Sequence, residues 1–300
     1  MKKKTYLFAL MAMALTLGSC SDNENGIGGE TSKYITVSTS IGNMTRVATD
    51  AKGGQTFEEG DEISVYAWTG APTVAPETSE RVVNNAINKL TNGSWVSTPQ
   101  MLWKNNRDKH YFIGVYPTAA ISDLSAGEYT FDVNKQTESD LLVAVNKDGL
   151  SYNVDEQQTV PLTFTHVMAK LVVNLTYKNQ WGGIPTVEKV VVGNAAKEAT
   201  INYLTKVVTP STTAKEDFSL PEITENTKYV SVIIPQEDVK QLTIVIGGKN
   251  FVYDNGTPFK LESGKITTVN LEVGRDEIKL GDVKITDWEN GSTFSGEALN

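Results

Sequence analysis

The sequence predicts an all-β protein made of two β-sandwich domains in tandem. Three observations indicate this fold class. Polar and apolar residues alternate with a period of two over most of the chain, which is the pattern of half-buried strands. Gly, Asn, Asp and Pro separate these short runs, and no stretch has the apolar stripe of a long helix. With 300 residues, of which 39% are hydrophobic, the chain is long enough for two buried cores.

Residues 1–19 have the pattern of a signal peptide. Lysines fill positions 2–4, and the apolar run 6–17 that follows is too short to span a bilayer as a helix. The run ends in Leu17-Gly18-Ser19-Cys20, which resembles a bacterial lipobox and places the cut of signal peptidase II between Ser19 and Cys20. Cys20 would carry the lipid, whose buried methylenes contribute about 0.8 kcal/mol each to membrane anchoring. The alternative is an ordinary secretory signal with an incidental cysteine.

Residues 20–33 predict a flexible, acidic tether. Asp22 and Glu24 follow the cysteine, and Gly26, Gly28 and Gly29 come next. The same stretch resembles the acidic export signal that takes Bacteroidetes lipoproteins to the outer face of the outer membrane. The two interpretations are compatible.

The first domain is predicted over residues 34–155. Strands with one apolar face are expected at residues 35–41, 63–67, 111–116, 129–133 and 141–145. The segment 82–90 fits a helical stripe as well as a strand. Because the hairpin signal Asn92-Gly93 follows it, a strand is favoured.

The second domain is predicted over residues 156–300, after the polar segment 146–158. Alternation starts again at 162–168 and continues at 171–177 with the opposite parity. Because a regular strand cannot change parity, we expect a bulge or a crossing between sheets near Ala169 and Lys170. Further strands are expected at residues 187–192, 229–234, 242–246, 251–253 and 266–273.

Composition argues against several classes of function. The formal charge of −9 becomes −12 without the three lysines at positions 2–4, so the chain lacks the basic face that nucleic acids require. One cysteine excludes an intrachain disulfide, and two histidines argue against a zinc cluster. No phosphate-binding loop, dinucleotide fingerprint or serine nucleophile elbow occurs, so we expect no cofactor and no catalytic residues. A hydrolase with paired carboxylates stays open as an alternative, because acidic residues are plentiful.

The histidines and tryptophans are interpreted as structural. His166 shares a strand face with Phe164, and both are expected inside the second domain, with His166 buried and hydrogen-bonded. His110 is expected in a solvated turn before a strand. Aromatic rings can stack on sugars, but core or edge-covering positions are expected for the five tryptophans: Trp68, Trp95, Trp103, Trp181 and Trp288.

Seven segments resemble motifs of the fimbrillin family of Bacteroidales, the major- and minor-fimbria-like lipoproteins, and they occur in the same order. They are Met44-Thr45-Arg46, Phe57 to Tyr66, Leu102-Trp103, Tyr111 to Pro117, Asp140 to Ala144, Leu162 to Leu171, and Ile285 to Gly291. Each motif is short, and the resemblance depends on their common order over nearly the whole chain.

The resemblance implies two transthyretin-like β-sandwiches that assemble into a surface fibre by strand exchange. The strand in which Ile35, Val37, Thr39 and Ile41 share one face lies between the lipid at Cys20 and Arg46. A trypsin-like cut after Arg46 would remove that strand and leave a groove that a strand of a neighbouring subunit could fill. Head-to-tail donation of this kind does not close, so it makes a filament.

The donor would be the C-terminal segment, which carries four apolar residues on alternating positions: Ile278, Leu280, Val283 and Ile285. Two alternatives stay open. Arg46 could be an ordinary exposed loop arginine, and the C-terminal segment could be the last strand of its own domain.

The sequence therefore predicts a non-enzymatic, lipid-anchored fimbrial subunit at the outer-membrane surface that supports adhesion. Its expected partners are other fimbrial subunits, the outer membrane through the lipid, and a host or bacterial surface glycan or protein. The alternative is a monomeric surface lipoprotein that binds glycans on an aromatic platform.

Overall fold

The computed structural model describes residues 33–42, 56–136, 139–156, 158–254 and 256–288. The signal peptide, the Ser19–Cys20 junction and Arg46 lie outside the described residues, so their predicted roles stay predictions.

The described part of the chain contains strands and two short 3-10 helices. The elements up to the middle of the chain are β1 (Thr36–Ile41), β2 (Glu62–Thr69), η1 (Thr78–Glu80), β3 (Arg81–Thr91), β4 (Ser94–Thr98), β5 (His110–Tyr116), β6 (Gly127–Thr130), β7 (Leu142–Leu150) and β8 (Thr159–His166). The later elements are β9 (Ala169–Tyr177), η2 (Asn179–Trp181), β10 (Val187–Ala196), β11 (Glu198–Asn202), β12 (Val207–Pro210), β13 (Lys215–Ser219), β14 (Glu222–Thr224), β15 (Lys228–Ile233), β16 (Gln241–Ile246), β17 (Lys249–Asp254), β18 (Lys265–Val273) and β19 (Ile278–Asp287).

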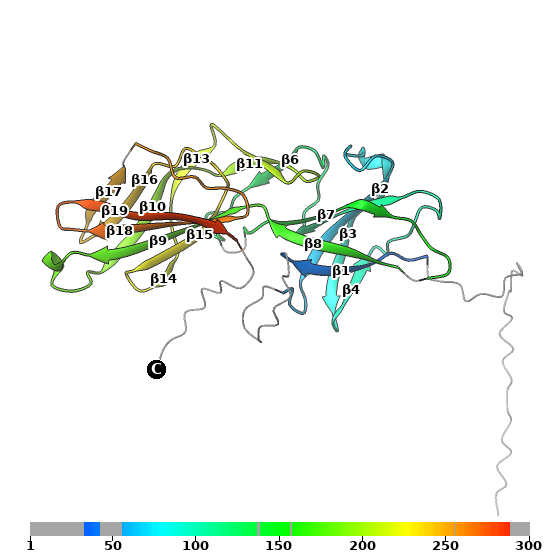
Figure 1. Cartoon of the computed structure of the whole chain (residues 1–300), viewed down its shortest axis with the longest axis horizontal. Helices are drawn as coiled ribbons and strands as arrows, with labels where there is room; N and C mark the ends of the chain where they lie inside the picture. The colour runs from blue at the N-terminus through cyan, green and yellow to red at the C-terminus, as the bar shows by residue number, and fades with distance from the viewer. Residues whose placement is uncertain (1–32, 43–55, 137–138, 157, 255, 289–300) are drawn as a thin grey trace, which may run out of the picture.

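The all-β fold class predicted from the sequence is confirmed. Figure 1 shows an elongated molecule, with the sheet that contains β1 to β5 at one end and the sheets of the C-terminal half at the other. In the part of the chain that the structure describes, no helix is long and apolar enough to cross a membrane.

The N-terminal half is built on one seven-stranded sheet with the order β1-β8-β7-β5-β2-β3-β4. The segment that fitted both a helix and a strand is β3, which pairs with β4 through a two-residue turn. Asn92 and Gly93 have φ angles of 51° and 73° in this turn, which suits the right-handed twist of a hairpin. The hairpin signal in the sequence is therefore confirmed.

The parity change near Ala169 and Lys170 marks a crossing between sheets. β8 pairs with β1 and β7 in the first sheet, whereas β9 pairs with β15 and β18 in another. The side chains can therefore change parity without a bulge inside one strand.

The C-terminal half is a sandwich of two sheets, with the orders β13-β10-β16-β17 and β14-β15-β9-β18-β19. Val190 and Ile244 from the first of these sheets pack in one core with Val173 and Val269 from the second. A small sheet, β12-β11-β6, joins the halves, because β6 comes from the N-terminal half of the sequence and pairs with β11.

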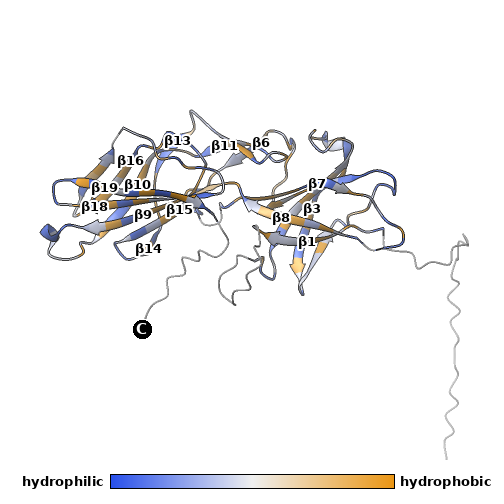
Figure 2. Cartoon of the chain, viewed as in Figure 1, coloured by the Kyte–Doolittle hydropathy of each residue, from blue (hydrophilic) through white to orange (hydrophobic). Residues whose placement is uncertain are grey.

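The two faces of the seven-stranded sheet belong to two different cores. One face forms what we call the inner core, which includes Val37, Val65, Phe112 and Phe164. The other face carries Tyr66 and Ile113 into a larger core that continues through Leu124 into the C-terminal sandwich; we call it the shared core. The expectation of a separate core for each half is therefore wrong, and Figure 2 shows apolar residues along strands of both halves.

The expected position of Phe164 is also wrong. This residue was expected in the second domain, but its side chain is fully buried in the inner core of the N-terminal sheet. The physical reason is that β8, which follows the polar segment 146–158, is still hydrogen-bonded to β7 and β1. The division of the chain into 34–155 and 156–300 stays a prediction.

A hydrogen-bonded cluster fixes the loop between β5 and β6, whose Ile121 and Leu124 lie in the shared core. Arg81 donates to the carbonyl oxygens of Ile121 at 2.6 Å and Ser122 at 2.5 Å, and its guanidinium lies 5.3 Å from the centre of the Tyr66 ring. The Tyr66 hydroxyl accepts the Ile121 N–H at 2.9 Å. Burial raises the pKa of Tyr66, so the hydroxyl keeps its proton for hydrogen bonding.

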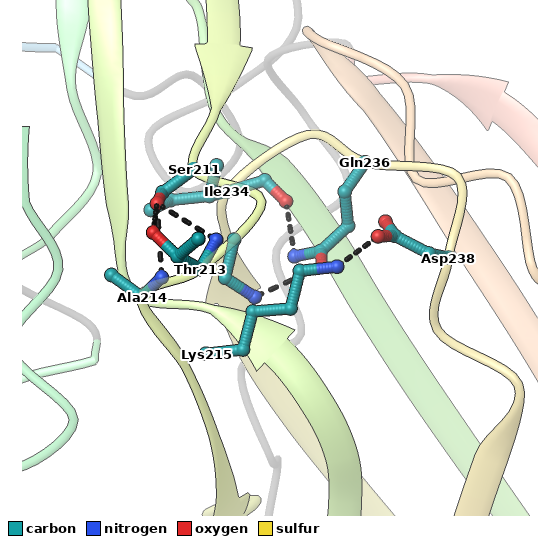
Figure 3. A network of polar contacts seen from close by, with 8 residues as sticks. Ser211, Thr213, Ala214, Lys215, Ile234, Gln236 and Asp238 are labelled. Carbon is teal, nitrogen blue, oxygen red and sulfur yellow. Dashed lines mark hydrogen bonds and ion pairs between the residues drawn. The ribbon is translucent and has the colours of Figure 1, made fainter.

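A second polar cluster lies in the C-terminal half around Gln236 (Figure 3). The Gln236 Oε1 accepts the Ala196 N–H at 2.9 Å, and its Nε2 donates to the Ile234 carbonyl at 2.9 Å. Lys215 and Asp238 form an ion pair beside it. Because the buried amide has partners for both its oxygen and its nitrogen, we interpret this cluster as structural.

Candidate functional site

The first candidate site is the edge of the N-terminal sheet where β1 lies. β1 pairs with β8 in parallel, in a register that runs from Thr36 opposite Thr159 to Ile41 opposite Phe164. On its other side, the described residues make few backbone hydrogen bonds. One of them is the bond of 2.9 Å from the N–H of Ile35, just before β1, to the Met101 carbonyl. β1 is therefore an edge strand with few backbone bonds on its outer side.

The side chains of β1 complete the inner core. Ile35, Val37 and Ile41 are 2%, 6% and 8% exposed, which confirms that alternate residues of this strand share a buried face. Thr39 occupies the fourth position on this face, and its Oγ1 accepts a hydrogen bond of 3.0 Å from Trp95 Nε1 on β4. β1 thus fills a place in the core between β8 and β4.

An aromatic cluster lies next to β1. Phe57 packs edge-on against Trp95, Tyr116 and Phe164, with ring centres 5.3, 5.4 and 5.1 Å apart. In the sequence, β1 comes before the segment 43–55, which contains Arg46, and Phe57 comes after it. A chain cut in that segment would keep Phe57 on the body of the protein and leave β1 held only by the contacts above.

The motif that follows Phe57 forms a tight turn. The Glu58 N–H donates to Asp61 Oδ2 at 2.7 Å, and Gly60 has a φ of 97°, a conformation that favours glycine. The Gly60 N–H also donates to the Leu90 carbonyl at 2.9 Å. Gly60 and Asp61 thus form the turn that precedes β2.

His110 is buried, which contradicts the expectation of a solvated turn. Its Nδ1 donates to the Asp108 carbonyl at 3.1 Å, its Nε2 accepts the Lys104 N–H at 3.0 Å, and its ring packs edge-on against Trp103 at 5.0 Å. The expectation failed because the polar residues directly before His110 are exposed, while the ring itself is covered by Trp103, which lies seven residues earlier in the chain. These two bonds require a neutral ring, and burial lowers its pKa.

We expect His110 to make stability depend on pH. The pKa of the folded state is below the ordinary value of 6.5, so the unfolded chain binds more protons in mild acid and stability falls as the pH drops below that value. Urea unfolding at pH 7.5 and pH 5.5 should show a smaller loss for His110→Gln, which accepts a hydrogen bond but does not titrate. Equal losses in both proteins would contradict this assignment.

The second candidate site is the C-terminal strand β19, which carries the four predicted donor residues. Among the strands that the structure describes, it pairs with β18 alone, at the edge of the five-stranded sheet. Ile278 and Leu280 pack against the shared core, whereas Val283 and Ile285 remain 42% and 38% exposed. In this single chain β19 is the last strand of its own sandwich, and whether it is donated stays a prediction.

Residues from three separate motifs meet at the end of β19. The ring of Trp288 stacks on that of His166 at 4.0 Å, with 6° between the planes, and Lys170 Nζ lies 5.2 Å from the Trp288 ring centre. His166 Nδ1 is 2.8 Å from Asp140 Oδ2. His166 is therefore buried and hydrogen-bonded as expected. Nothing in the sequence pattern indicates that Asp140, His166 and Trp288 are in contact.

The other parts of the surface offer less chemistry. Among the described residues, no group of three or more His, Cys, Asp or Glu side chains is placed to hold a metal ion. None of the five tryptophans has an exposed side chain: Trp68 and Trp103 are buried, and Trp95, Trp181 and Trp288 are half-buried. The strand edges at β1 and β19 are thus the features that the sequence and the fold both single out.

The chain belongs to the fimbrillin-like family, because the model of that family matches residues 45–288. This confirms the resemblance carried by the ordered motifs. The match begins at residue 45, after β1, and ends at Trp288. A comparison with curated proteins finds no match.

Solved structures of low sequence identity share the fold. A candidate cell adhesion protein of Bacteroides uniformis has a TM-score of 0.64 at 18% identity, over 87% of this chain and 100% of that one. A candidate cell adhesion protein of Bacteroides ovatus has a TM-score of 0.64 at 17% identity, over 86% and 98%. A fimbrial protein of Bacteroides vulgatus has a TM-score of 0.52 at 11% identity, over 85% and 99%.

Proposed function

We propose that this chain is a structural, non-enzymatic subunit of a surface fimbrium that assembles by strand exchange in the place of β1. In this proposal a trypsin-like protease cuts after Arg46, β1 leaves, and the C-terminal segment of a second subunit takes its place. One observation carries the proposal: β1 is an edge strand that completes a core and is joined to the body through the segment that contains Arg46. The adhesion role rests on the family and on structural neighbours that are described as cell adhesion or fimbrial proteins.

Loss of β1 would leave a surface that favours another strand. Ile35, Val37 and Ile41 are almost fully buried, and each such side chain stabilises the fold by about 1.5–3 kcal/mol. The backbone groups of β8 and the Met101 carbonyl would also lose their partners, at about 1–3 kcal/mol for each group that stays buried. A strand with an apolar face can satisfy both needs, as in other cases of strand addition.

Donation from head to tail explains a fibre. The groove lies in the N-terminal sheet and β19 lies in the C-terminal sandwich, at the other end of the elongated molecule (Figure 1). A subunit that receives a strand at one end and donates one from the other makes an open chain. For this, β19 must leave β18, and its edge position means that only the backbone bonds with this one strand have to break.

Removal of β1 from the gene tests the proposal directly. We expect a chain of residues 47–300 to form multimers that survive on a denaturing gel without heating, while the chain 21–300, which retains β1, stays monomeric. A chain of residues 47–275, which lacks the donor segment, is the control and should not form a ladder. A chain 47–300 that is folded by circular dichroism and stays monomeric at high concentration would contradict strand exchange.

We also propose that Cys20 is lipidated and anchors the precursor to the outer membrane. The basic start, the apolar run 6–17 and the residues Gly18, Ser19 and Cys20 support this. Cys20→Ala should move the protein from the detergent phase to the aqueous phase in Triton X-114 partitioning. A Cys20→Ala protein that partitions like the wild type would show that the lipobox interpretation is wrong.

A further inference from the structure

The pairing of β19 with β18 contains a bulge of one residue. Leu280 lies opposite Leu271 and Val283 lies opposite Val269, so β19 uses one residue more than β18 over this step. The extra residue falls at Gly281 and Asp282. The Asp282 carbonyl accepts a hydrogen bond of 3.0 Å from Asn270 Nδ2, and a Cβ at Gly281 would lie 3.2 Å from the Asn270 carbonyl oxygen.

The bulge changes which side chains share a face. In a regular strand, Ile278 and Leu280 would point to one face, and Val283 and Ile285 would point to the other. With the bulge, all four lie opposite residues of β18 that are themselves buried on one face: Val273, Leu271, Val269 and Thr267. β19 therefore presents four apolar side chains in a row.

This row has the same number of positions as the buried face of β1. Those positions are Ile35, just before β1, and Val37, Thr39 and Ile41 in the strand itself. β1 pairs with β8 without a bulge. A donor strand without a bulge could place only two of its four apolar residues in the groove. Of the four apolar residues of β19, Val283 and Ile285 are the two that the chain's own sandwich covers least.

We propose that the bulge at Gly281 and Asp282 is the specificity determinant of the donor strand: it lets β19 of one subunit fill all four positions that β1 vacates in the next. This inference rests on the proposed function. It assigns to Gly281 and Asp282 a role in choosing the register, separate from the apolar contacts of the four donor residues.

Synthetic peptides of residues 275–288 test the inference on the cleaved full-length protein. One peptide lacks Asp282, so its four apolar residues alternate regularly and share one face without a bulge. Its control lacks Asp276, so the two peptides have the same length and composition, but the control keeps the spacing from Ile278 to Ile285. Fluorescently labelled peptide that remains bound after gel filtration is measured, together with the length of the multimers that form in its presence.

We expect all three peptides to bind alike and to shorten the multimers, because the bulge lets the native spacing fill the same four positions that the regular spacing of the peptide without Asp282 fills. A peptide without Asp282 that binds at least about tenfold more tightly than the control would overturn the role of the bulge and leave strand exchange intact, because the native spacing would then place only two of its four apolar side chains in the groove. If multimers form but even the native peptide neither binds nor shortens them, the donor is another segment. If the cleaved protein forms no multimers, the proposed function itself fails.

Discussion

Arg46→Ala is expected to abolish both maturation and fibre growth while the fold stays intact. Arg46 is the one arginine in the sequence between β1 and Phe57, so without it a trypsin-like protease that cuts after arginine has no cleavage point there, and Ile35, Val37 and Ile41 keep their places in the inner core. The groove then stays occupied by the chain's own strand, and a donor cannot enter. The measurement is the mass of the surface protein together with the ladder of multimers on a gel without heating.

Arg107→Ala is the matched control for this substitution. Arg107 is an exposed arginine in the turn before β5, outside the segment 43–55 that joins β1 to the body. The control should be processed and should form multimers like the wild type. Arg46→Ala protein that forms fibres as readily as the wild type would contradict the proposed activation step.

Phe164→Ala is expected to be the most destabilising single substitution in the inner core, at about 3–5 kcal/mol. The ring is fully buried and packs against Phe57 at 5.1 Å. It also fills the space over Gly114, where an added Cβ would lie 2.6 Å from Phe164 Cζ. Because the backbone of β5 closes the site, the cavity left by alanine cannot collapse easily. Urea unfolding monitored by tryptophan fluorescence measures the loss.

Thr163→Ala provides the comparison on the same strand. Thr163 is exposed and contacts the Ser40 hydroxyl at 3.2 Å, so its loss should change stability by no more than about 0.5 kcal/mol. A loss below about 1 kcal/mol for Phe164→Ala would mean that the ring is not a central part of the inner core.

Much of the fold follows from local patterns. The alternation in β9, β16 and β18 and the turn at Asn92 and Gly93 are properties of neighbouring residues, so the sequence predicts them well. β11, β12 and β13 were not predicted. They are four or five residues long, and each contains only one or two large apolar residues. Tertiary pairing rather than a local pattern therefore defines them.

Burial was harder to predict than strand position. The burial of His110 depends on Trp103, and the place of Phe164 depends on the pairing of β8 with β1 across more than a hundred residues. Periodicity shows which face is apolar, but it does not show which sheet that face joins.

The candidate site shows the same limit. Alternating apolar residues near the two ends of the chain predict the strand before Arg46 and the four apolar residues of β19. They do not show that β1 lies at a sheet edge or that a bulge in β19 aligns these four residues. They also do not show that Trp288 stacks on His166, since these contacts depend on register and on three-dimensional proximity.

The N-terminal residue of the protein recovered from assembled surface fibres tests the central claim most directly. Cleavage after Arg46 and loss of β1 predict that mature subunits begin at Val47 and that no peptide from residues 34–45 is found in the fibre by mass spectrometry. Mature subunits that retain residues 34–45 would contradict strand exchange at the groove of β1.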